Sequence, residues 1–310
     1  MDSNSARIAF TTNMCTHYTI KLFELLSKRY NIHFYFTGGY ENYWDQENKM
    51  WSGQFTGEYL KGFVLPGTHF KISPSLFKLF FKNFDFFIKT IEDRFALPFI
   101  FLLSKAKGKP FILWTQMWCH PQNIFHKISF FFLSFIYHHT DAFVVCGEHV
   151  KRYLTNLGVS SEKIFCAPHS VDNNLFNKEV SLQEKETLKK QLELSDQRII
   201  LYVGRLEKAK GLHYLVEAVA ALSDPRIAVL FIGRGSEKPC LEEECKRLPG
   251  RFLFLDHIPN NHLNRYYALA DVFVLPSITT KDFKEPWGLV INEAMNQGCP
   301  VITTDAVGAA

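Results

Sequence analysis

The chain has 310 residues, of which 47% are hydrophobic and 21% charged, and its net charge at pH 7 is +4. These values are those of a folded globular protein, so they exclude a disordered or low-complexity chain. The small basic excess does not indicate nucleic acid, because no stripe of Lys and Arg interleaved with stacking aromatics is present. The length allows two domains, since single cores rarely grow beyond about 250–300 residues.

The first half of the chain alternates apolar runs with helical patterns, which is typical of β-α units and parallel sheets. The expected strands are residues 7–11, 32–37, 59–65, 85–88, 111–115, 142–146 and 164–167. The expected helices are residues 19–29, 75–83, 93–107, 123–138 and 148–157. Seven strands with helices between them predict one complete α/β domain.

A second series of the same kind follows a change of composition at residues 171–197, so we predict domains at 1–180 and 181–310. Its expected strands are 198–203, 228–232, 252–255, 272–275 and 300–303, and its expected helices are 212–222, 236–248, 262–268 and 288–297. The sequence stops after the last strand, although a parallel sheet is covered on both faces. We therefore expect a second domain that is incomplete at its C-terminus, with a short natural C-terminus as the alternative.

The sequence also bears on the location of the protein. The seven cysteines form no Cys-x-x-Cys pair and no zinc-like spacing with histidine, which favours a reducing cytosol. The N-terminus has no pattern of a secretion signal. The longest apolar runs, 95–103 and 128–137, are shorter than the ~20 residues of a membrane-spanning helix. We expect a cytoplasmic protein.

A basic loop, Gly204-Arg205 to Lys210-Gly211, follows the strand expected at 198–203. In open parallel sheets, ligands bind outside the carboxyl ends of the strands. A glycine that lets the backbone turn, nearby cations and the free amides of a helix start together form a phosphate site. A loop of solvated lysines is an equal alternative.

The next strand is followed by Gly233-Arg234-Gly235. A dinucleotide fingerprint needs a third glycine at position 238, which is Lys238, so the nicotinamide interpretation loses its main support. Gly233 is a candidate for a place near a nucleotide, and a plain tight turn is the alternative.

Two glutamates, Glu285 and Glu293, lie on either side of a helix start at Gly288. The amides of Gly288, Leu289 and Val290 point out of this helix start, and the positive end of its dipole faces the same way. The arrangement can hold a diphosphate between two carboxylates that accept hydrogen bonds from sugar hydroxyls. Taken singly, each glutamate is more simply a cap or an ordinary helical residue.

The ordered set of motifs resembles the nucleotide-binding half of family 4 retaining glycosyltransferases of the GT-B fold. It consists of Gly204-Arg205 with Gly211, the run from Ala270 to Ser277, Glu285 with Glu293, and Ala294-Met295 with Gly298 and Pro300. The stretches 141–149 and 167–176 are similar to the segment that leads to the joint in that family. The resemblance implies an α/β protein with two Rossmann-like domains that face a cleft.

The resemblance also implies a role for each candidate residue. Arg205 and Lys210 would neutralise the diphosphate leaving group, Glu293 would hold the ribose hydroxyls, and Glu285 would meet hydroxyls of the donor sugar. The amides of residues 288–290 would touch the phosphates or the sugar, beside Gly204. Fixed cations and dipoles aimed at developing negative charge are the main requirement for departure of a nucleoside diphosphate.

The implied reaction is transfer of a sugar from a UDP-, GDP- or ADP-sugar to a glycan or lipid-linked acceptor, with retention, in cell-surface polysaccharide synthesis. No Asp-x-Asp occurs in the chain, so we predict that the reaction needs neither a metal nor a further cofactor. Two alternatives stay open. One is a nucleotide-sugar epimerase of GT-B-like fold, and the other is a non-catalytic fragment that binds a sugar nucleotide.

The sequence departs from the family pattern in several places. Residues 11–18 replace a glycine-rich loop, His169-Ser170 replaces an Asn-Gly, and Asp256 stands where glycine is usual. A family histidine after a middle strand of the first domain has two candidate equivalents, Gln116 and His120. We assign the catalytic role to His120, with a loop histidine beside aromatic packing as the alternative.

Two segments of the first domain combine aromatic residues with lysines. Residues 74–84 contain Lys78 and Lys82, and residues 125–133 contain Lys127. Such helices can lie in a membrane interface, with aromatics inserted and cations over anionic lipid heads. We expect an anionic membrane surface as a partner, at the inner face of the membrane; packing of these helices on the sheet is the alternative.

Overall fold

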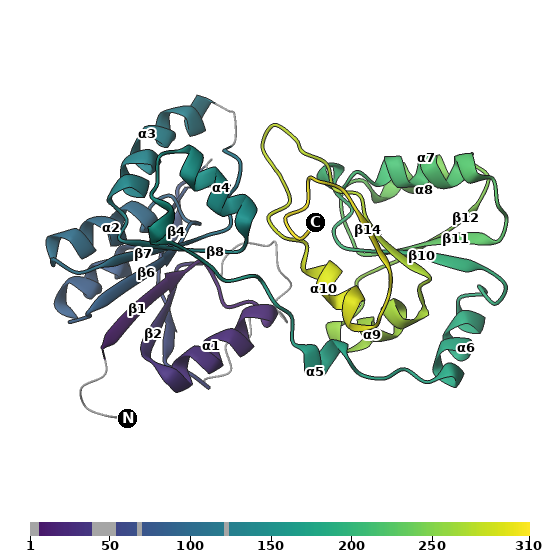
Figure 1. Ribbon diagram of the computed structural model, residues 1–310, viewed down its shortest axis with the longest axis horizontal. Helices are drawn as coiled ribbons and strands as arrows, with labels where there is room; N and C mark the ends of the chain where they lie inside the picture. The colour runs from purple at the N-terminus through teal and green to yellow at the C-terminus, as the bar shows by residue number, and fades with distance from the viewer. Residues whose placement is uncertain (1–5, 39–53, 67–69, 121–123) are drawn as a thin grey trace. The chain divides into compact units, whose positions relative to one another are not determined.

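The computed structural model describes residues 6–38, 54–66, 70–120 and 124–310. The chain divides into two compact units, shown in Figure 1. Unit 1 comprises residues 1–118 and 124–168, and unit 2 comprises residues 119–123 and 169–310. Each unit is an α/β structure built on a parallel sheet, which confirms the predicted fold class.

Unit 1 is built on a seven-stranded parallel sheet with the strand order β3-β2-β1-β6-β7-β8-β9. Its strands are β1 (Arg7–Thr12), β2 (Asn31–Phe36), β3 (Gly57–Tyr59), β6 (Phe86–Thr90), β7 (Phe111–Thr115), β8 (Ala142–Val145) and β9 (Ile164–Cys166). Its helices are α1 (His17–Arg29), η2 (Pro74–Phe81), α2 (Ala96–Ala106), α3 (Ile124–His139), α4 (Glu148–Asn156) and η3 (Ser161–Lys163). Figure 1 shows α1 on one side of this sheet and α2, α3 and α4 on the other.

The chain contains 30 phenylalanines, and several of them lie in the layer between α1 and the sheet of unit 1. Phe10, Phe23, Phe34 and Phe36 are buried there together. The rings of Phe23 and Phe34 stack with their centroids 4.5 Å apart. Aromatic rings bury large apolar areas, and such pairs add about 0.5–1.5 kcal/mol beyond area burial. These phenylalanines are therefore core residues.

The strand expected at 59–65 is wrong as a single element. Only β3 joins the sheet, and β4 (Phe63–Val64) pairs antiparallel with β5 (Lys71–Ile72). The break falls at Gly62, where a Cβ would lie 2.5 Å from the carbonyl oxygen of Ile72. The helix expected at 75–83 is the 3-10 helix η2, which begins with Pro74. Asn123, the expected start of the next helix, lies outside the described residues.

Unit 2 is built on a five-stranded parallel sheet with the order β12-β11-β10-β13-β14. Its strands are β10 (Arg198–Val203), β11 (Ile227–Ile232), β12 (Arg251–Leu255), β13 (Val272–Leu275) and β14 (Val301–Thr303). Its helices are α5 (Asn173–Phe176), α6 (Leu182–Gln191), η4 (Lys208–Lys210), α7 (Leu212–Leu222), α8 (Lys238–Cys245), α9 (Asn260–Leu269) and α10 (Leu289–Asn296). Figure 1 shows α7 and α8 on one side of the sheet and α9 and α10 on the other.

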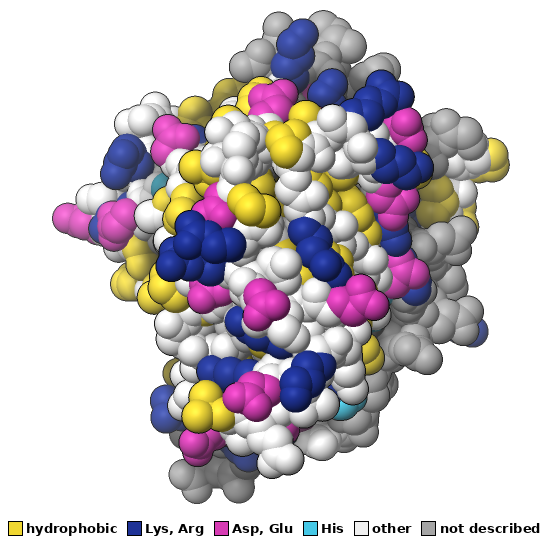
Figure 2. Space-filling view, turned by 90° about the vertical axis from the view of Figure 1, so that its right-hand side faces the viewer, with side chains coloured by type: hydrophobic (Ala, Val, Ile, Leu, Met, Phe, Trp, Pro, Cys, Tyr) yellow, Lys and Arg dark blue, Asp and Glu magenta, His cyan; other side chains and the backbone are white. Residues whose placement is uncertain are grey.

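The surface of unit 2 carries mixed charges. On α8 and the residues that follow it, Glu243 pairs with both Lys246 and Arg247. Figure 2 shows basic and acidic side chains interspersed in the same way over one face of the molecule. Such exposed pairs contribute little stability, about 0–1 kcal/mol each, and they keep the surface hydrated.

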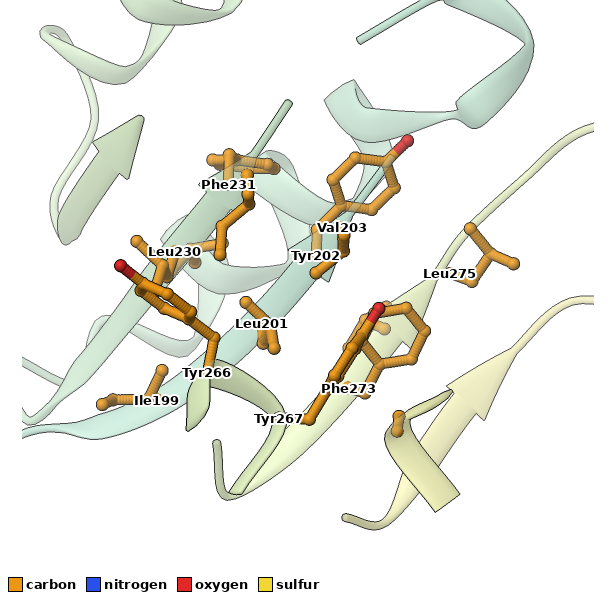
Figure 3. Close-up of a cluster of buried hydrophobic side chains, with 14 of the residues drawn as sticks. Ile199, Leu201, Tyr202, Val203, Leu230, Phe231, Tyr266, Tyr267, Phe273 and Leu275 are labelled. Atoms are coloured by element: carbon orange, nitrogen blue, oxygen red, sulfur yellow. The ribbon is translucent and has the colours of Figure 1, made fainter. Parts of the chain in front are cut away.

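The core of unit 2 centres on β10 and its neighbours (Figure 3). Leu201 and Tyr202 of β10 and Phe231 of β11 are fully buried. Tyr267 of α9 packs on Phe273 of β13 with ring centroids 5.7 Å apart. The strands read as continuous apolar runs because both faces of this parallel sheet are covered.

The unit boundary differs from the predicted one, because residues 169–180 belong to unit 2. Phe176 of α5 is buried in the core of unit 2. The side chain of Gln297, just after α10, donates a hydrogen bond to the carbonyl oxygen of Lys178 at 2.9 Å. The polar composition of this segment therefore marks a surface of unit 2.

Of the helices in the described part of the chain, none has the length and apolarity needed to cross a membrane.

Candidate functional site

The sheet of unit 2 reverses its direction of growth between β10 and β13. From β10 the chain moves outward to β11 and then β12, and it returns to β13 and β14 on the other side of β10. The loops that follow β10 and β13 therefore leave the same edge in opposite directions. Ligands of open α/β sheets bind at this switch point, outside the carboxyl ends of the strands.

A pocket of about 340 Å³ lies at this switch point. The loop after β10 contributes one wall and the loop after β13 the other, and the lining residues are Arg205, Glu207, Lys208, Ala209, Lys210, Thr280 and Phe283. Three cationic side chains thus line one hollow, together with the carboxylate of Glu207, a hydroxyl group and an aromatic ring. This composition suits an anion that is attached to a larger ligand.

Two of these lining residues were not found from the sequence. No site residue was predicted between Ser277 and Glu285. In the structure Thr280 accepts the N–H of Phe283 on its hydroxyl at 3.0 Å, which closes a tight turn. This turn holds the Phe283 ring 5.7 Å from Nζ of Lys210. In the sequence, this turn is indicated by Thr279 and Thr280 followed by Asp282, because Thr and Asp side chains often hydrogen-bond to the backbone of a turn.

Glycines allow the loops of the site to cross at close range. Gly211 has φ +63°, and a Cβ at this position would lie 2.2 Å from the carbonyl oxygen of Pro276. Gly233 has φ +145°, and its Cβ would lie 1.9 Å from the carbonyl oxygen of Gly204. Both positions are therefore restricted to glycine. Gly233 supports the loop of Arg205 through this packing, and a contact of Gly233 or Gly204 with nucleotide stays a prediction.

Lys210 and Glu285, two predicted site residues, form a buried ion pair. Ser277 donates a second hydrogen bond to the same carboxylate oxygen at 3.4 Å. The main chain of Glu285 is held in turn by the N–H of Gly308, at 3.1 Å from the Glu285 carbonyl oxygen. A lysine ammonium has three donors. The pair therefore fixes Lys210 in place and leaves it able to donate to a ligand as well.

The helix α10 begins shortly after Glu285, at the helix start predicted from the sequence. Gly288 is its N-cap with φ +89°, and a Cβ there would lie 2.8 Å from Cδ2 of Leu275. The first N–H groups of a helix have no acceptor within the helix. The amides of Leu289 and Val290 are in this first turn, where the helix dipole also favours an anion. Trp287 is anchored by a 2.8 Å hydrogen bond from its indole nitrogen to Asn292.

Glu293 lies in the second turn of α10 and is buried. It accepts a 2.7 Å hydrogen bond from the hydroxyl group of Tyr267. Burial raises the pKa of the Glu293 carboxyl to about 7. A carboxyl group in this state shifts toward its ionised form when further donors bind to it.

Arg205 follows β10 and is exposed at the pocket. Its carbonyl oxygen accepts a 2.6 Å hydrogen bond from the hydroxyl group of Tyr202, which is buried in the strand just before. Burial raises the pKa of Tyr202 well above its usual value, so the hydroxyl group stays protonated as a donor. Tyr202 is a supporting residue that the sequence analysis missed, although a tyrosine in an otherwise aliphatic strand end was a visible signal.

His120, Gln116 and Asp256, which the sequence analysis also singled out, are not among the residues that line this pocket. His120 is half-buried and follows β7, and it groups with unit 2. Gln116, the alternative, donates a 3.5 Å hydrogen bond to Glu92. Asp256 follows β12 and accepts a 2.7 Å hydrogen bond from Lys238. The catalytic role of His120 therefore stays a prediction.

Comparisons with known proteins identify relatives of this chain. Residues 184–310 match the family model described as Glycosyl transferases group 1. An uncharacterized glycosyltransferase of Methanocaldococcus jannaschii is 34% identical over 137 residues, which cover 43% of this chain and 34% of that protein. The putative teichuronic acid biosynthesis glycosyltransferase TuaC of Bacillus subtilis is 38% identical over 127 residues, covering 41% of this chain and 30% of that protein. The chain thus spans about a third of the length of these curated relatives.

Solved structures resemble the chain over nearly its whole length. The crystal structure of Anabaena HepE in complex with UDP superposes with a TM-score of 0.74 at 17% identity, covering 98% of this chain and 82% of that chain. At this identity the likeness shows the fold, which is the GT-B fold of glycosyltransferases. Residues 184–310 are therefore similar to the family of glycosyl transferases group 1, and the chain has the GT-B fold.

Proposed function

We propose that this chain transfers a sugar from a nucleoside diphosphate sugar to a glycan or lipid-linked acceptor, with retention of configuration. The observation that carries the proposal is the pocket at the switch point of unit 2, where Arg205, Lys208 and Lys210 line one hollow and Lys210 pairs with Glu285, shortly before the N-cap of α10. The complex of HepE with UDP supports a nucleotide donor. The name of the Bacillus subtilis relative supports a role in surface polysaccharide synthesis.

The proposed roles of the residues are those that the resemblance implies, and the chemistry of each side chain suits its role. Arg205 and Lys210 neutralise the diphosphate as it departs, and the amides of Leu289 and Val290 add dipoles that need no reorganisation. Glu293 accepts hydrogen bonds from the ribose, and Glu285 holds Lys210 and meets the donor sugar. His120 acts on the acceptor side. No Asp-x-Asp is available for a metal clamp, so we propose a reaction that a chelator leaves unchanged.

Thermal shift in the presence of UDP-, GDP- and ADP-sugars tests the donor site. We expect one of these to raise the melting temperature of the wild-type protein. Arg205→Ala should weaken that ligand by about tenfold or more, because a charge-assisted hydrogen bond contributes about 1.5–3 kcal/mol. Arg247→Ala is the matched control, since Arg247 is an exposed arginine paired with Glu243. Failure of all three nucleotide sugars to stabilise the protein would reject the site.

Product analysis separates transfer from the alternative of an epimerase. Incubation with the donor that binds and with a lipid extract or oligosaccharide mixture should form a new glycosidic bond with the anomeric configuration of the donor. An isomerised donor without a new bond would favour the epimerase. Tight donor binding without either product would favour a binding fragment. The reaction is repeated with EDTA, and loss of product would overturn metal independence.

A further inference from the structure

The helices on one side of the unit 1 sheet form a continuous layer. The chain moves along the sheet in one direction from β6 to β7 to β8, so right-handed crossovers place α2 and α3 on the same face. Figure 1 shows these helices together on one side. Ring contacts join them: Phe99 of α2 lies 4.9 Å from Phe77 of η2, and Phe101 of α2 lies 6.1 Å from Phe135 of α3.

The outer side of this layer is apolar. Six large hydrophobic side chains on the three helices are at least half exposed, and we call them the outer apolar surface: Phe77, Phe81, Leu102, Phe131, Phe132 and Phe135. Phe81 is 91% exposed and Phe131 is 78% exposed. Single exposed hydrophobic residues are ordinary on proteins, whereas a group of them on neighbouring helices marks an interaction surface.

The charges on the helices that carry this surface have a positive excess. The segments η2, α2 and α3 contain no Asp or Glu, in contrast to the mixed charges of α8. Four lysines belong to these helices or directly follow them: Lys78, Lys82, Lys105 and Lys107. Glu58 pairs with two of them and Asp141 with a third, while the ammonium of Lys107 donates to the main-chain carbonyls of Phe80 and Lys82. The surroundings are therefore net positive. The side chain of Lys127, also predicted here, lies outside the described residues.

We propose that the outer apolar surface docks on a lipid bilayer that contains anionic phospholipid. A bilayer interface accepts exposed aromatic side chains without requiring a complementary shape, and its anionic head groups attract the net positive charge of these helices. Long lysine side chains reach head groups while their methylene stems stay beside the aromatic rings. The proposal rests on unit 1 alone and is independent of the donor site in unit 2. It concerns a protein that lies on the membrane rather than one that spans it.

Flotation of the whole chain with vesicles tests this docking. The wild type should float with vesicles of phosphatidylcholine and phosphatidylglycerol, and less with phosphatidylcholine alone. High salt should reduce the recovery, because salt screens the attraction of the lysines. The double variant Phe81→Asp with Phe131→Asp should lose partitioning by more than about tenfold, since it removes two aromatic side chains from the interface. Leu182→Asp is the matched control, because Leu182 of α6 in unit 2 is also 78% exposed.

Two further measurements keep the test decisive. Circular dichroism melting and the donor thermal shift should be unchanged in the double variant, which shows that it is folded. Amide hydrogen exchange of the wild type should slow in residues 76–82 and 130–136 when anionic vesicles are added, and this needs no variant. A wild type that stays in the soluble fraction, or a double variant that floats equally well, overturns the proposal. A wild-type dimer that the double variant abolishes, without flotation, would assign the surface to a second copy of the chain instead.

Discussion

At the scale of single residues, the burial of Glu293 links its protonation state to ligand binding. Its pKa of about 7 arises from desolvation, which the hydrogen bond from Tyr267 offsets only in part. The folded protein therefore binds this proton more tightly than the unfolded chain. The stabilising effect of the proton is complete below about pH 4.5, the ordinary value, and is lost as the pH rises through about 7.

We expect donor binding to release a proton at pH 6, because ribose hydroxyls that donate to Glu293 favour its ionised form. Titration calorimetry in buffers of different ionisation enthalpy measures this release, with the nucleotide sugar that stabilises the protein as the ligand. The release should vanish at pH 8.5 and in Glu293→Gln, which keeps the size of the side chain and an acceptor for Tyr267. Equal proton release by the variant and the wild type would show that another group titrates.

The ion pair of Lys210 and Glu285 is a second prediction at this scale. Removing one partner leaves a buried charge, so Lys210→Met alone should lower the free energy of unfolding by about 3 kcal/mol. The double variant Lys210→Met with Glu285→Gln should regain most of this loss, because neither charge remains. Urea unfolding of the four proteins in this cycle measures the coupling. Additive effects of the two substitutions would contradict a direct pair. All three variants of the cycle should bind the donor more weakly than the wild type.

At the scale of elements, the site depends on how closely the loops after β10 and β13 approach each other. Gly211→Ala forces a Cβ against the carbonyl oxygen of Pro276 and should cost about 3 kcal/mol or more, with loss of donor binding. Gly108→Ala is the control, because Gly108 has nearly the same φ of +62° but open space around it. It should cost only about 1 kcal/mol. Equal costs in chemical unfolding would show that strain alone, rather than loop packing, restricts Gly211.

Most elements were predictable because their signals are local. The apolar runs of β7 and β10 and the period of α7 are contained in five to eleven consecutive residues, and their bounds agree with the structure. The strand expected at 59–65 failed for a non-local reason. Its residues are divided between the sheet edge at β3 and the separate pair of β4 with β5, and that choice depends on where Phe36 and Ile72 lie.

At the scale of the whole molecule, each unit has its own sheet and its own hydrophobic core. We therefore expect two transitions in scanning calorimetry, because domains with separate cores need not unfold together. The donor at 100 times its Kd should stabilise one transition by about 2.7 kcal/mol. Gly211→Ala should lower that same transition, and Gly108→Ala should lower the other. A single transition that the donor shifts as a whole would contradict independent unfolding.

The sequence by itself determined the α/β class, the order of most strands and helices, and the candidate donor residues Arg205, Lys210, Glu285 and Glu293. These follow from periodicity and from short motifs at strand ends, where turn residues and free helix amides are local properties. The resemblance of the ordered motifs supplied their roles, and the family match of residues 184–310 agrees with it.

Only the tertiary structure decided which of these residues meet. Lys210 and Glu285 are 75 positions apart, and they pair because β10 and β13 are neighbours in the sheet. The same holds for residues 169–180, whose polar composition gave no sign that Phe176 enters the core of unit 2. The outer apolar surface also depended on the structure, because a phenylalanine pattern does not distinguish rings under the sheet from rings in solvent. Contacts between distant residues are set by strand order and by the packing of layers. Neither can be predicted from a short segment of the sequence, because both depend on residues far apart in the chain.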